Sequence, residues 1–476
     1  MATNGEPNGH TVVVSNGTAR GPTTTPILVF AAAGATGHMA PALHIAREMI
    51  KRGFPAVFLA TDEFKEQVEA IGAEWFEQIP MFTPEIIEAR EKTPLGPGRV
   101  IWDFEHVWLS KLPSQFERFR AVLETVRERA PGRPVVVVAE TMSLVALPFV
   151  YGAPPPRGYD RFPHVVCFNV VPLVVSSTDT APFGAGLPPD ATESGRARNR
   201  VLYDLMYGVP FAPLVGLFQA TLDRLGCTSH PDRFMFDAML DSYDVTFQMC
   251  SASLEYPRSD LAPSIRFAGA LPHRGLDPKY VYPDWWGEIT ANAALPHGAP
   301  GKKAVVPMAQ GTIATNYTEL ILPALAGLAH RDDIIVIAIL GIKGAELPEG
   351  HTVPANAKVV DYLPYDAVLA YADVFVTNGG YGGMTHSIIN GVPMVVGGIT
   401  EDKVEVTARV EYAGLGVNLK TQTPTPEAIA AAVDKVLGNP AYKKRALRLR
   451  QENEDLDSLS IIEKQIRAYS TKDSSA

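Results

Sequence analysis

Short apolar segments alternate with amphipathic segments along this chain from Pro26 onward. The runs 27–33, 56–60 and 135–139 have the length and apolar composition of buried strands, and the segment 38–52 carries apolar residues at helical spacing. Such alternation is typical of a parallel sheet that is covered by helices on both faces. The pattern therefore predicts an α/β fold.

A second series of strands and helices follows a stretch rich in Pro, Gly and Arg, which we interpret as an interdomain linker. Two Rossmann-like domains are therefore expected, and ligands should bind in the cleft at the carboxyl ends of their strands. The expected boundaries are a flexible leader at 1–25, an N-terminal domain at 26–255, the linker at 256–283, a C-terminal domain at 284–440, and a C-terminal helix (441–469) with its tail at 441–476.

The composition limits the classes of partner and compartment. A net charge of -10 disfavours a nucleic-acid-binding surface, which needs clustered Lys and Arg. The three cysteines form neither a CxxC pair nor a disulfide framework, which favours a reducing compartment. The first 25 residues lack the features of a secretory signal, and no apolar run reaches the roughly 20 residues that span a bilayer. We expect a cytoplasmic protein without a transmembrane segment, for which only peripheral membrane contact remains open.

Gly34 and Gly37 lie where the first predicted strand meets its helix. Glycines relax the backbone there, and the helix N-terminus presents free N–H groups to the cleft. NAD(P)-binding proteins use a similar turn, but their third glycine is replaced by Ala40, and the chain has no Tyr-x-x-x-Lys pair. This turn alone does not decide the function.

His38 follows the turn and is expected to face the cleft, where the helix N-terminus favours a neutral, basic imidazole. An imidazole that acts as a general base needs an acceptor on its other nitrogen. Glu140 follows the predicted strand 135–139 and should lie at the same edge of the sheet. Without chemistry, His38 would cap its helix and Glu140 would be an ordinary carboxylate in the first turn of the next one.

Four glycines occur within the five positions 379–383, again between a predicted strand and a helix. They let the backbone approach a ligand closely, and the helix amides behind them suit a diphosphate. A purely structural turn rarely needs so many glycines.

This cluster and five further motifs resemble the family-one UDP-glycosyltransferases, most closely the bacterial and fungal members that act on macrolides, lipids and polyketides. The resemblance extends from residue 26 to about residue 420 and implies a GT-B fold, with the two domains facing each other across the cleft. The matching motifs are Gly37-His38-x-x-Pro41, Gln310-Gly311-Thr312, Tyr362-Leu363-Pro364-Tyr365, Thr377-Asn378-Gly379-Gly380, Gly391-Val392-Pro393 and Glu401-Asp402-Lys403.

The resemblance implies an inverting transfer of a hexose, with UDP-glucose favoured, to a hydroxyl of a small lipophilic acceptor such as a polyketide, terpenoid, phenolic or lipid. His38 would deprotonate the acceptor while Glu140 holds the imidazole, and neither a cofactor nor a metal would be required. The implied donor contacts are Tyr362 and Leu363 at the uracil, Gln310, Gly311, Thr312, Asn378, Gly380, Tyr381, Gly382 and Gly383 around the diphosphate, His386 at the ribose, and Asp402 and Lys403 at the sugar.

Several positions depart from the family pattern. Tyr362 replaces Trp, Asn378 replaces His, and Glu140 replaces Asp. His386 stands where a Glu often contacts the ribose, and Lys403 stands where many glucosyltransferases have Gln. Because lysine offers only donors, the sugar contacts must differ, and a deoxysugar donor is an alternative.

Aromatic residues gather in the least regular part of the N-terminal domain, which suits an apolar acceptor pocket, although the same spacing is common in cores. The Pro- and Gly-rich stretch 178–190 is a candidate loop over that pocket. Two other functions stay open: a nucleotide-sugar epimerase, which would need several acid and base groups around the sugar, and an NAD(P)-binding oxidoreductase. The aromatic residues are Phe82, Trp102, Phe104 and Trp108.

Overall fold

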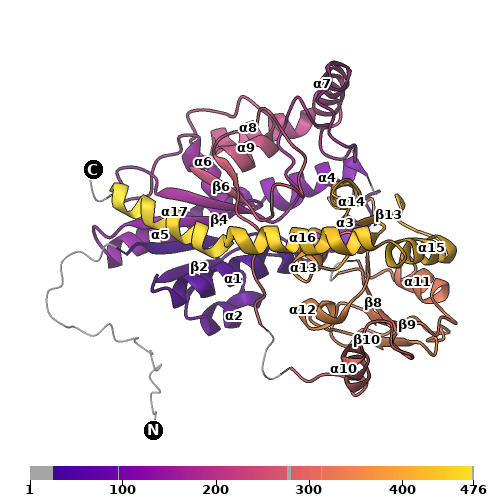
Figure 1. The fold of residues 1–476 in the computed structure, drawn as a ribbon. Coiled ribbons are helices and arrows are strands. Elements are labelled where there is room, and N and C mark those ends of the chain that lie inside the picture. The colour runs from indigo at the N-terminus through magenta and orange to yellow at the C-terminus, as the bar shows by residue number, and fades with distance from the viewer. Residues whose placement is uncertain (1–24, 95, 276–279, 312–313, 474–476) are drawn as a thin grey trace, which may run out of the picture.

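The computed structural model describes residues 25–94, 96–275, 280–311 and 314–473. Within these ranges the chain forms two α/β domains, each built on one parallel sheet (Figure 1). The N-terminal sheet has the order β3-β2-β1-β4-β5-β6-β7, and the C-terminal sheet has the order β10-β9-β8-β11-β12-β13. The predicted α/β class with two Rossmann-like domains is confirmed.

The N-terminal domain carries its helices on both faces of the sheet. Its described strands are β1 (Ile27–Ala31), β2 (Ala56–Ala60), β3 (Glu74–Glu77), β4 (Val135–Glu140), β5 (His164–Asn169), β6 (Val245–Gln248) and β7 (Ile265–Phe267). Its described α-helices are α1 (Thr36–Lys51), α2 (Lys65–Ala70), α3 (Pro84–Glu91), α4 (Pro97–Asp103), α5 (Leu112–Arg129), α6 (Leu147–Val150), α7 (Glu193–Gly208), α8 (Ala212–Arg224) and α9 (Met235–Asp241).

The C-terminal domain repeats this plan and is followed by two further helices. Its described strands are β8 (Ala304–Ala309), β9 (Ile334–Ile339), β10 (Ala357–Val360), β11 (Phe375–Thr377), β12 (Met394–Val396) and β13 (Gly416–Asn418). The described helices of this half of the chain are α10 (Trp286–Ala294), α11 (Ile321–Gly327), α12 (Tyr365–Val368), α13 (Tyr381–Ile389), α14 (Lys403–Tyr412), α15 (Pro426–Leu437), α16 (Pro440–Leu456) and α17 (Ser458–Asp473).

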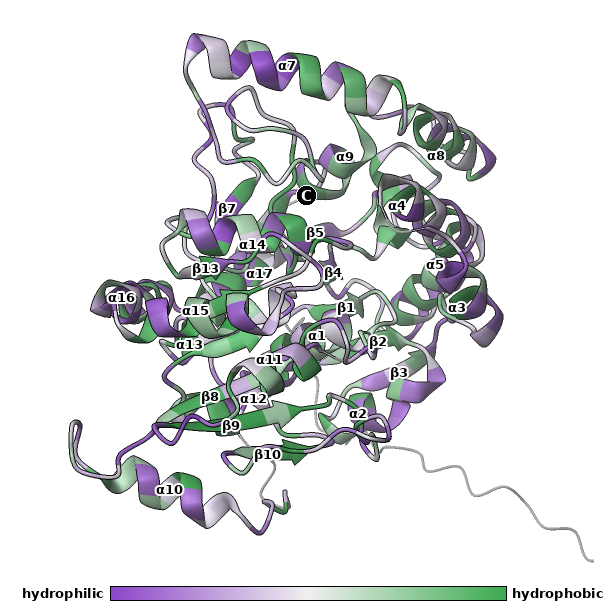
Figure 2. Cartoon of the chain, turned by 90° about the vertical axis from the view of Figure 1, so that its right-hand side faces the viewer, coloured by the Kyte–Doolittle hydropathy of each residue, from purple (hydrophilic) through white to green (hydrophobic). Residues whose placement is uncertain are grey.

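Both faces of each sheet are buried at its central strands, which explains why strands such as β1 and β9 are apolar throughout. In β1, Leu28 and Phe30 pack into one core while Val29 and Ala31 pack into the core on the opposite face. Strand β9 divides its side chains in the same way between two cores of the C-terminal domain. Figure 2 shows β8 and β9 in the apolar colour, whereas the surface helices α7 and α10 mix polar and apolar residues.

The pattern of apolar runs missed the two edge strands of the N-terminal sheet. Strand β3 has a Glu at each end and no buried residue, so it carries no apolar run. Strand β7 lies inside the range 256–283 that was predicted as linker, yet it pairs in parallel with β6. Edge strands are short and partly exposed, and their composition resembles that of loops.

The single C-terminal helix predicted over 441–469 is wrong, because Asp457 adopts a left-handed conformation (φ 49°) that ends α16 and begins α17. The first of these helices packs on α13 of the C-terminal domain, whereas the second packs on α1, β4 and β5 of the N-terminal domain (Figure 1). The crossing point is held by hydrogen bonds from the Ala270 N–H to Asn453 Oδ1 (2.7 Å) and from Ser458 Oγ to the Ala270 carbonyl (3.1 Å).

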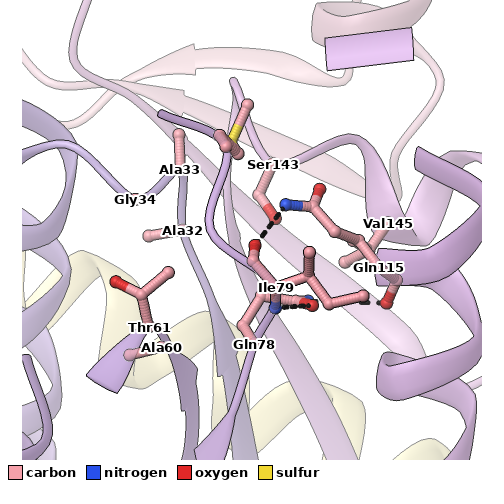
Figure 3. A pocket seen from close by; sticks show the side chains of 11 residues that line it. Ala32, Ala33, Gly34, Ala60, Thr61, Gln78, Ile79, Gln115, Ser143 and Val145 are labelled. Carbon is pink, nitrogen blue, oxygen red and sulfur yellow. Dashed lines mark hydrogen bonds between the residues drawn. The ribbon is translucent and has the colours of Figure 1, made fainter. Parts of the chain in front are cut away.

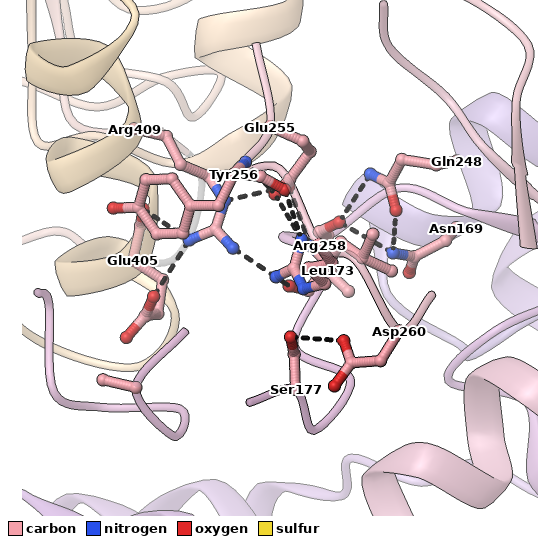
Figure 4. Close-up of polar contacts among 12 residues, drawn as sticks. Asn169, Leu173, Ser177, Gln248, Glu255, Tyr256, Arg258, Asp260, Glu405 and Arg409 are labelled. Atoms are coloured by element: carbon pink, nitrogen blue, oxygen red, sulfur yellow. Dashed lines mark hydrogen bonds and ion pairs between the residues drawn. The ribbon is translucent and has the colours of Figure 1, made fainter. Parts of the chain in front are cut away.

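A fully buried guanidinium joins the two domains (Figure 4). Arg409, on α14, pairs with Glu255, which follows β6 of the N-terminal domain (2.8 Å), and with Glu405 one turn earlier on its own helix (2.9 Å). It also donates to the carbonyl of Leu173 (2.9 Å), and its guanidinium lies 4.4 Å from the centroid of the Tyr256 ring. A buried charge is stable only when every donor is satisfied, so these contacts fix how the domains meet.

Helix α7 lies at the outer end of the N-terminal domain (Figure 2). It exposes Val201 and Leu205, and the exposed Val209 follows it. Among the described residues no single helix is long and apolar enough to cross a membrane. Helices α7 and α8 together have the length and composition of a membrane span, but they are bent by 62° relative to each other. Peripheral membrane contact stays a prediction.

Truncating one side chain of α17 should destabilise the N-terminal domain. Ile466 is fully buried in the core that contains Leu28 and Phe30, so Ile466→Ala should lower the free energy of unfolding by about 2–5 kcal/mol. Lys464→Ala, at an exposed position of the same helix, is the matched control. The measurement is urea denaturation followed by circular dichroism, and equal midpoints for the two variants would contradict the packing.

Candidate active site

His38 and Glu140 meet at the carboxyl edge of the N-terminal sheet. Strands β1 and β4 are parallel neighbours, so the turn after β1 and the last residue of β4 lie at the same edge. His38, in the first turn of α1, places Nδ1 2.9 Å from Oε1 of the fully buried Glu140. The backbone N–H groups of Ala33 (3.4 Å) and Met142 (3.1 Å) donate to the same carboxylate. An ionised Glu140 accepts from Nδ1–H, which leaves Nε2 as the basic nitrogen.

The electrostatics make His38 a stronger base than a free imidazole. Burial lowers the pKa of His38, but the charge and hydrogen bond of Glu140 and the charge of Asp402 outweigh it, so the pKa is raised above 6.5. The helix N-terminus was expected to favour the neutral form, and the two carboxylates shift the pKa in the opposite direction. The pair combines an oriented imidazole with increased basicity, as a general base requires.

Asp402 belongs to the C-terminal domain and precedes α14. Burial raises the pKa of its carboxyl, and the charge of His38 partly offsets that rise. The two residues therefore act on each other across the cleft. The flanking residues form an ion pair in which Lys403 Nζ contacts a carboxylate oxygen of Glu401, and Lys403 also lies 3.2 Å from Thr400 Oγ1.

The glycine cluster forms a backbone cradle at the N-terminus of α13. Gly379 has a φ of 81°, and an added Cβ would lie 2.5 Å from Thr407 Cγ2, so only glycine fits there. Gly380 is the N-cap of the helix, and nothing lies within 4 Å of the position a Cβ would take at Gly380 or Gly382. Gly383 sits in the same first turn. The space beside these amides suits an anion.

Two side chains of the predicted diphosphate site shape its loops. Asn378 is buried and donates from Nδ2 to the backbone carbonyl of Gln310 (2.7 Å), which ties the loop after β11 to the loop after β8. The Gln310 side chain donates to the carbonyls of Ala314 (3.3 Å) and Asn316 (3.0 Å), within its own loop. Gly311 follows with a φ of 84°. The prediction for Thr312 falls outside the described residues.

The side chain of Tyr381 is not placed in the cradle. Its ring is buried, and its hydroxyl accepts a hydrogen bond from Gln248 Nε2 (2.8 Å) at the end of β6. Tyr381 therefore contributes to the domain interface, and only its backbone lies at the start of α13.

The predicted nucleoside-binding residues lie around Asp366, which the sequence reasoning missed. Tyr362 is partly exposed, with the ammonium of Lys343 5.9 Å from its ring centroid, whereas the side chain of Leu363 is in the core. His386 is held by Asp366, with 2.6 Å between Nδ1 and Oδ1. Burial raises the pKa of Asp366, but its hydrogen bonds to His273 and His386 outweigh this and hold the pKa well below its usual range. Asp366 and His386 are twenty positions apart on different helices, so no local pattern pairs them.

A small pocket lies beside the first glycine turn (Figure 3), and three of the aromatic residues pack against a cluster that includes Ala33 and Met81 of its lining. Trp108 donates from Nε1 to the carbonyl of Met142 (3.1 Å), the residue whose N–H contacts Glu140, and Phe82 packs edge-on against its ring. Phe104 is instead buried in the core. The aromatic side chains that partly line this region are Phe82, Trp102 and Trp108, and the pocket itself is lined by Ala32, Ala33, Gly34, Ala60, Thr61, Gln78, Ile79, Met81, Gln115, Ser143 and Val145.

The loop 178–190 contacts the opposite domain. The backbone N–H groups of Gly184 (2.9 Å) and Gly186 (3.1 Å) both donate to Oε1 of Glu405 on α14. An added Cβ at Gly186 would lie 2.7 Å from Val404 Cγ2, so the loop approaches the helix closely. The loop 178–190 thereby attaches the N-terminal domain to α14, the helix that begins directly after Asp402.

Comparison with known proteins agrees with this geometry. Residues 323–460 match the family described as "Erythromycin biosynthesis protein CIII-like, C-terminal domain". Over 451 residues, 94% of this chain and 96% of the relative, the chain is 39% identical to UDP-glucosyltransferase 1 of Beauveria bassiana. The chain belongs to the UDP-glycosyltransferase family.

This UDP-glycosyltransferase is also 33% identical to 4'-demethylrebeccamycin synthase of Lentzea aerocolonigenes, over 87% of this chain and 93% of that one. Its fold matches the glycotransferase of kitacinnamycin (TM-score 0.68, 19% identity), with 93% of this chain and 99% of that one covered. It also matches a spinosyn rhamnosyltransferase (TM-score 0.60, 15% identity), with 93% and 100% covered. The predicted GT-B fold and glycosyl transfer from a UDP-sugar are confirmed, and these relatives favour neither an epimerase nor an oxidoreductase.

The basicity of His38 in this UDP-glycosyltransferase should depend on Glu140. Glu140→Gln removes the adjacent negative charge, so the titration midpoint of the His38 imidazole should move to lower pH by a unit or more. The measurement is an NMR titration of the imidazole protons. His44 is an internal reference, because burial lowers its pKa to about 4 without help from Glu140. An unchanged His38 midpoint would show that the carboxylate does not set it.

Proposed function

We propose that this UDP-glycosyltransferase transfers a hexose, glucose in the first instance, from its UDP derivative to a hydroxyl of a small lipophilic acceptor, with inversion at the anomeric carbon. The observation that carries the proposal is the pair of His38 and Glu140 at the end of the N-terminal sheet, opposite Asp402 of the other domain. A base on one side of the cleft and a candidate sugar-binding carboxylate on the other are what direct displacement requires.

In the proposed step, Nε2 of His38 takes the proton from the acceptor hydroxyl as its oxygen attacks the anomeric carbon. The bond from that carbon to the diphosphate oxygen breaks, and UDP leaves with the electron pair. Glu140 stays ionised and stabilises the imidazolium, which is consistent with the raised pKa of His38. General-base assistance of this kind contributes roughly 10²–10⁴-fold to the rate.

The departing UDP would be stabilised by the N-terminus of α13, where Gly380 and Gly382 leave the backbone open, in place of a metal ion. The exposed ring of Tyr362 would stack on the uracil. Asp402, which interacts electrostatically with His38 across the cleft, would accept hydrogen bonds from sugar hydroxyls.

A lipophilic acceptor is supported by the half-buried rings of Phe82 and Trp108 near the base. Trp108 is attached to the same turn as the dyad, through Met142. The name of one relative, UDP-glucosyltransferase 1, supports glucose as the transferred sugar.

Removing the base should abolish transfer and spare donor binding. His38→Ala should lower kcat at least 100-fold, because it removes the base proposed to accept the proton of the acceptor hydroxyl, while the Kd for UDP-glucose changes less than about twofold. The acceptors are pooled phenolics, terpenoids and lipids, with products detected by mass spectrometry and binding by calorimetry. His351→Ala, at an exposed loop position, is the control of matched residue type. Full transfer by His38→Ala would refute the assigned base.

The stereochemistry of the product tests the direct displacement separately. An α-linked UDP-glucose donor should yield a β-glucoside, visible as a large coupling constant of the anomeric proton in the NMR spectrum of the purified product. An α-glucoside would exclude the single in-line step.

A further inference from the structure

An alternating chain of charges crosses the cleft beside Asp402. Arg90, at the end of α3, binds Asp103 with two parallel hydrogen bonds, from Nε to Oδ1 (2.8 Å) and from Nη2 to Oδ2 (3.0 Å). The same Nη2 donates to Oε1 of Glu401 in the C-terminal domain (3.2 Å). Glu401 in turn contacts Lys403. Both cations are mostly buried, with 17% and 14% of their side chains exposed.

The ion pairs of Glu401 with Arg90 and Lys403 hold the loop that carries Asp402 in a strained conformation. Glu401 has a φ of 50°, a left-handed conformation that costs a non-glycine residue on the order of 1 kcal/mol. Its carboxylate is fixed from one side by Arg90 and from the other by Lys403. Asp103 also lies between Trp102 and Phe104, so the same contacts connect the aromatic segment to the donor side.

Both cations of this charge network already have carboxylate partners. Arg90 is shared by Asp103 and Glu401, and Lys403 is paired with Glu401. An anionic sugar placed beside Asp402 would have to compete with Glu401 for Lys403, and a desolvated anion that gains no cation partner is strongly unfavourable.

We infer that the Arg90–Glu401–Lys403 chain makes this enzyme select donors with an uncharged sugar and reject uronic acids, with Glu401 as the specificity-determining residue and Arg90 as its positioning residue. The inference rests on the proposed function, because it takes Asp402 as the contact to the donor sugar. Lys403 does not attract an anionic sugar because Glu401 neutralises it.

The test compares the binding of UDP-glucose and UDP-glucuronic acid by calorimetry, without an acceptor. The wild-type enzyme should bind UDP-glucose at least tenfold more tightly. Glu401→Gln keeps the size of the side chain but removes the carboxylate that neutralises Lys403, while Arg90 stays paired with Asp103, so the preference should fall about tenfold or more. Glu411→Gln, an exposed carboxylate on α14 paired with Lys420, should leave the preference unchanged.

The variant Arg90→Ala tests whether Arg90 only positions Glu401 or also determines the preference between the two donors. It leaves the pair of Glu401 and Lys403 intact, so the preference for UDP-glucose should persist while the affinity for both donors falls together. Equal binding of the two donors by the wild-type enzyme, or an unchanged preference in Glu401→Gln, would overturn the inference alone. Failure of the wild-type enzyme to bind either donor would instead overturn the proposed function.

Discussion

The buried guanidinium of Arg409 is the contact on which the relation between the two domains depends. A charge that is removed from water is tolerated only when its partners are complete, and here Glu255 and the Leu173 carbonyl come from one domain while Glu405 comes from the other. The domains can therefore not slide past each other without exposing unpaired charges. That restriction is what keeps His38 opposite Asp402, two residues carried by different sheets.

The same network attaches a second segment of the N-terminal domain to α14. Glu405 accepts hydrogen bonds from Arg409 and also from the backbone of Gly184 and Gly186, so the loop 178–190 and α14 form one unit. A few residues earlier, Glu401 is bound by Arg90 from the segment that carries the aromatic residues. Elements of the two domains thus share charged partners on both sides of Asp402, and the position of one domain restricts the position of the other.

Much of this arrangement could be predicted from local pattern. Strands such as β9 are continuous apolar runs, and His38 and Glu140 could be paired because parallel neighbouring strands end at one edge. Contacts between segments that are distant in the chain could not be predicted: Arg90 and Glu401 are 311 positions apart, and the motif that contains Glu401 gives no sign of a partner in the N-terminal domain. For Tyr381 the motif was misleading. Its position in the glycine cluster predicted a contact with the diphosphate, whereas its ring is buried and its hydroxyl binds Gln248 of the N-terminal domain.

The position of α17 has a consequence for how the protein comes to be folded. Arg52 of the first half pairs with Glu463 of this helix, 411 positions away, and the helix packs on part of one face of the N-terminal sheet, beside α1. During synthesis the first domain emerges from the ribosome long before this helix exists, and until then part of that apolar face is uncovered. Closing so large a loop is slow, and the uncovered face is open to wrong partners in the interval. We therefore expect the N-terminal domain to reach its final packing only after the C-terminal domain has been made, and chaperones to matter most in that interval.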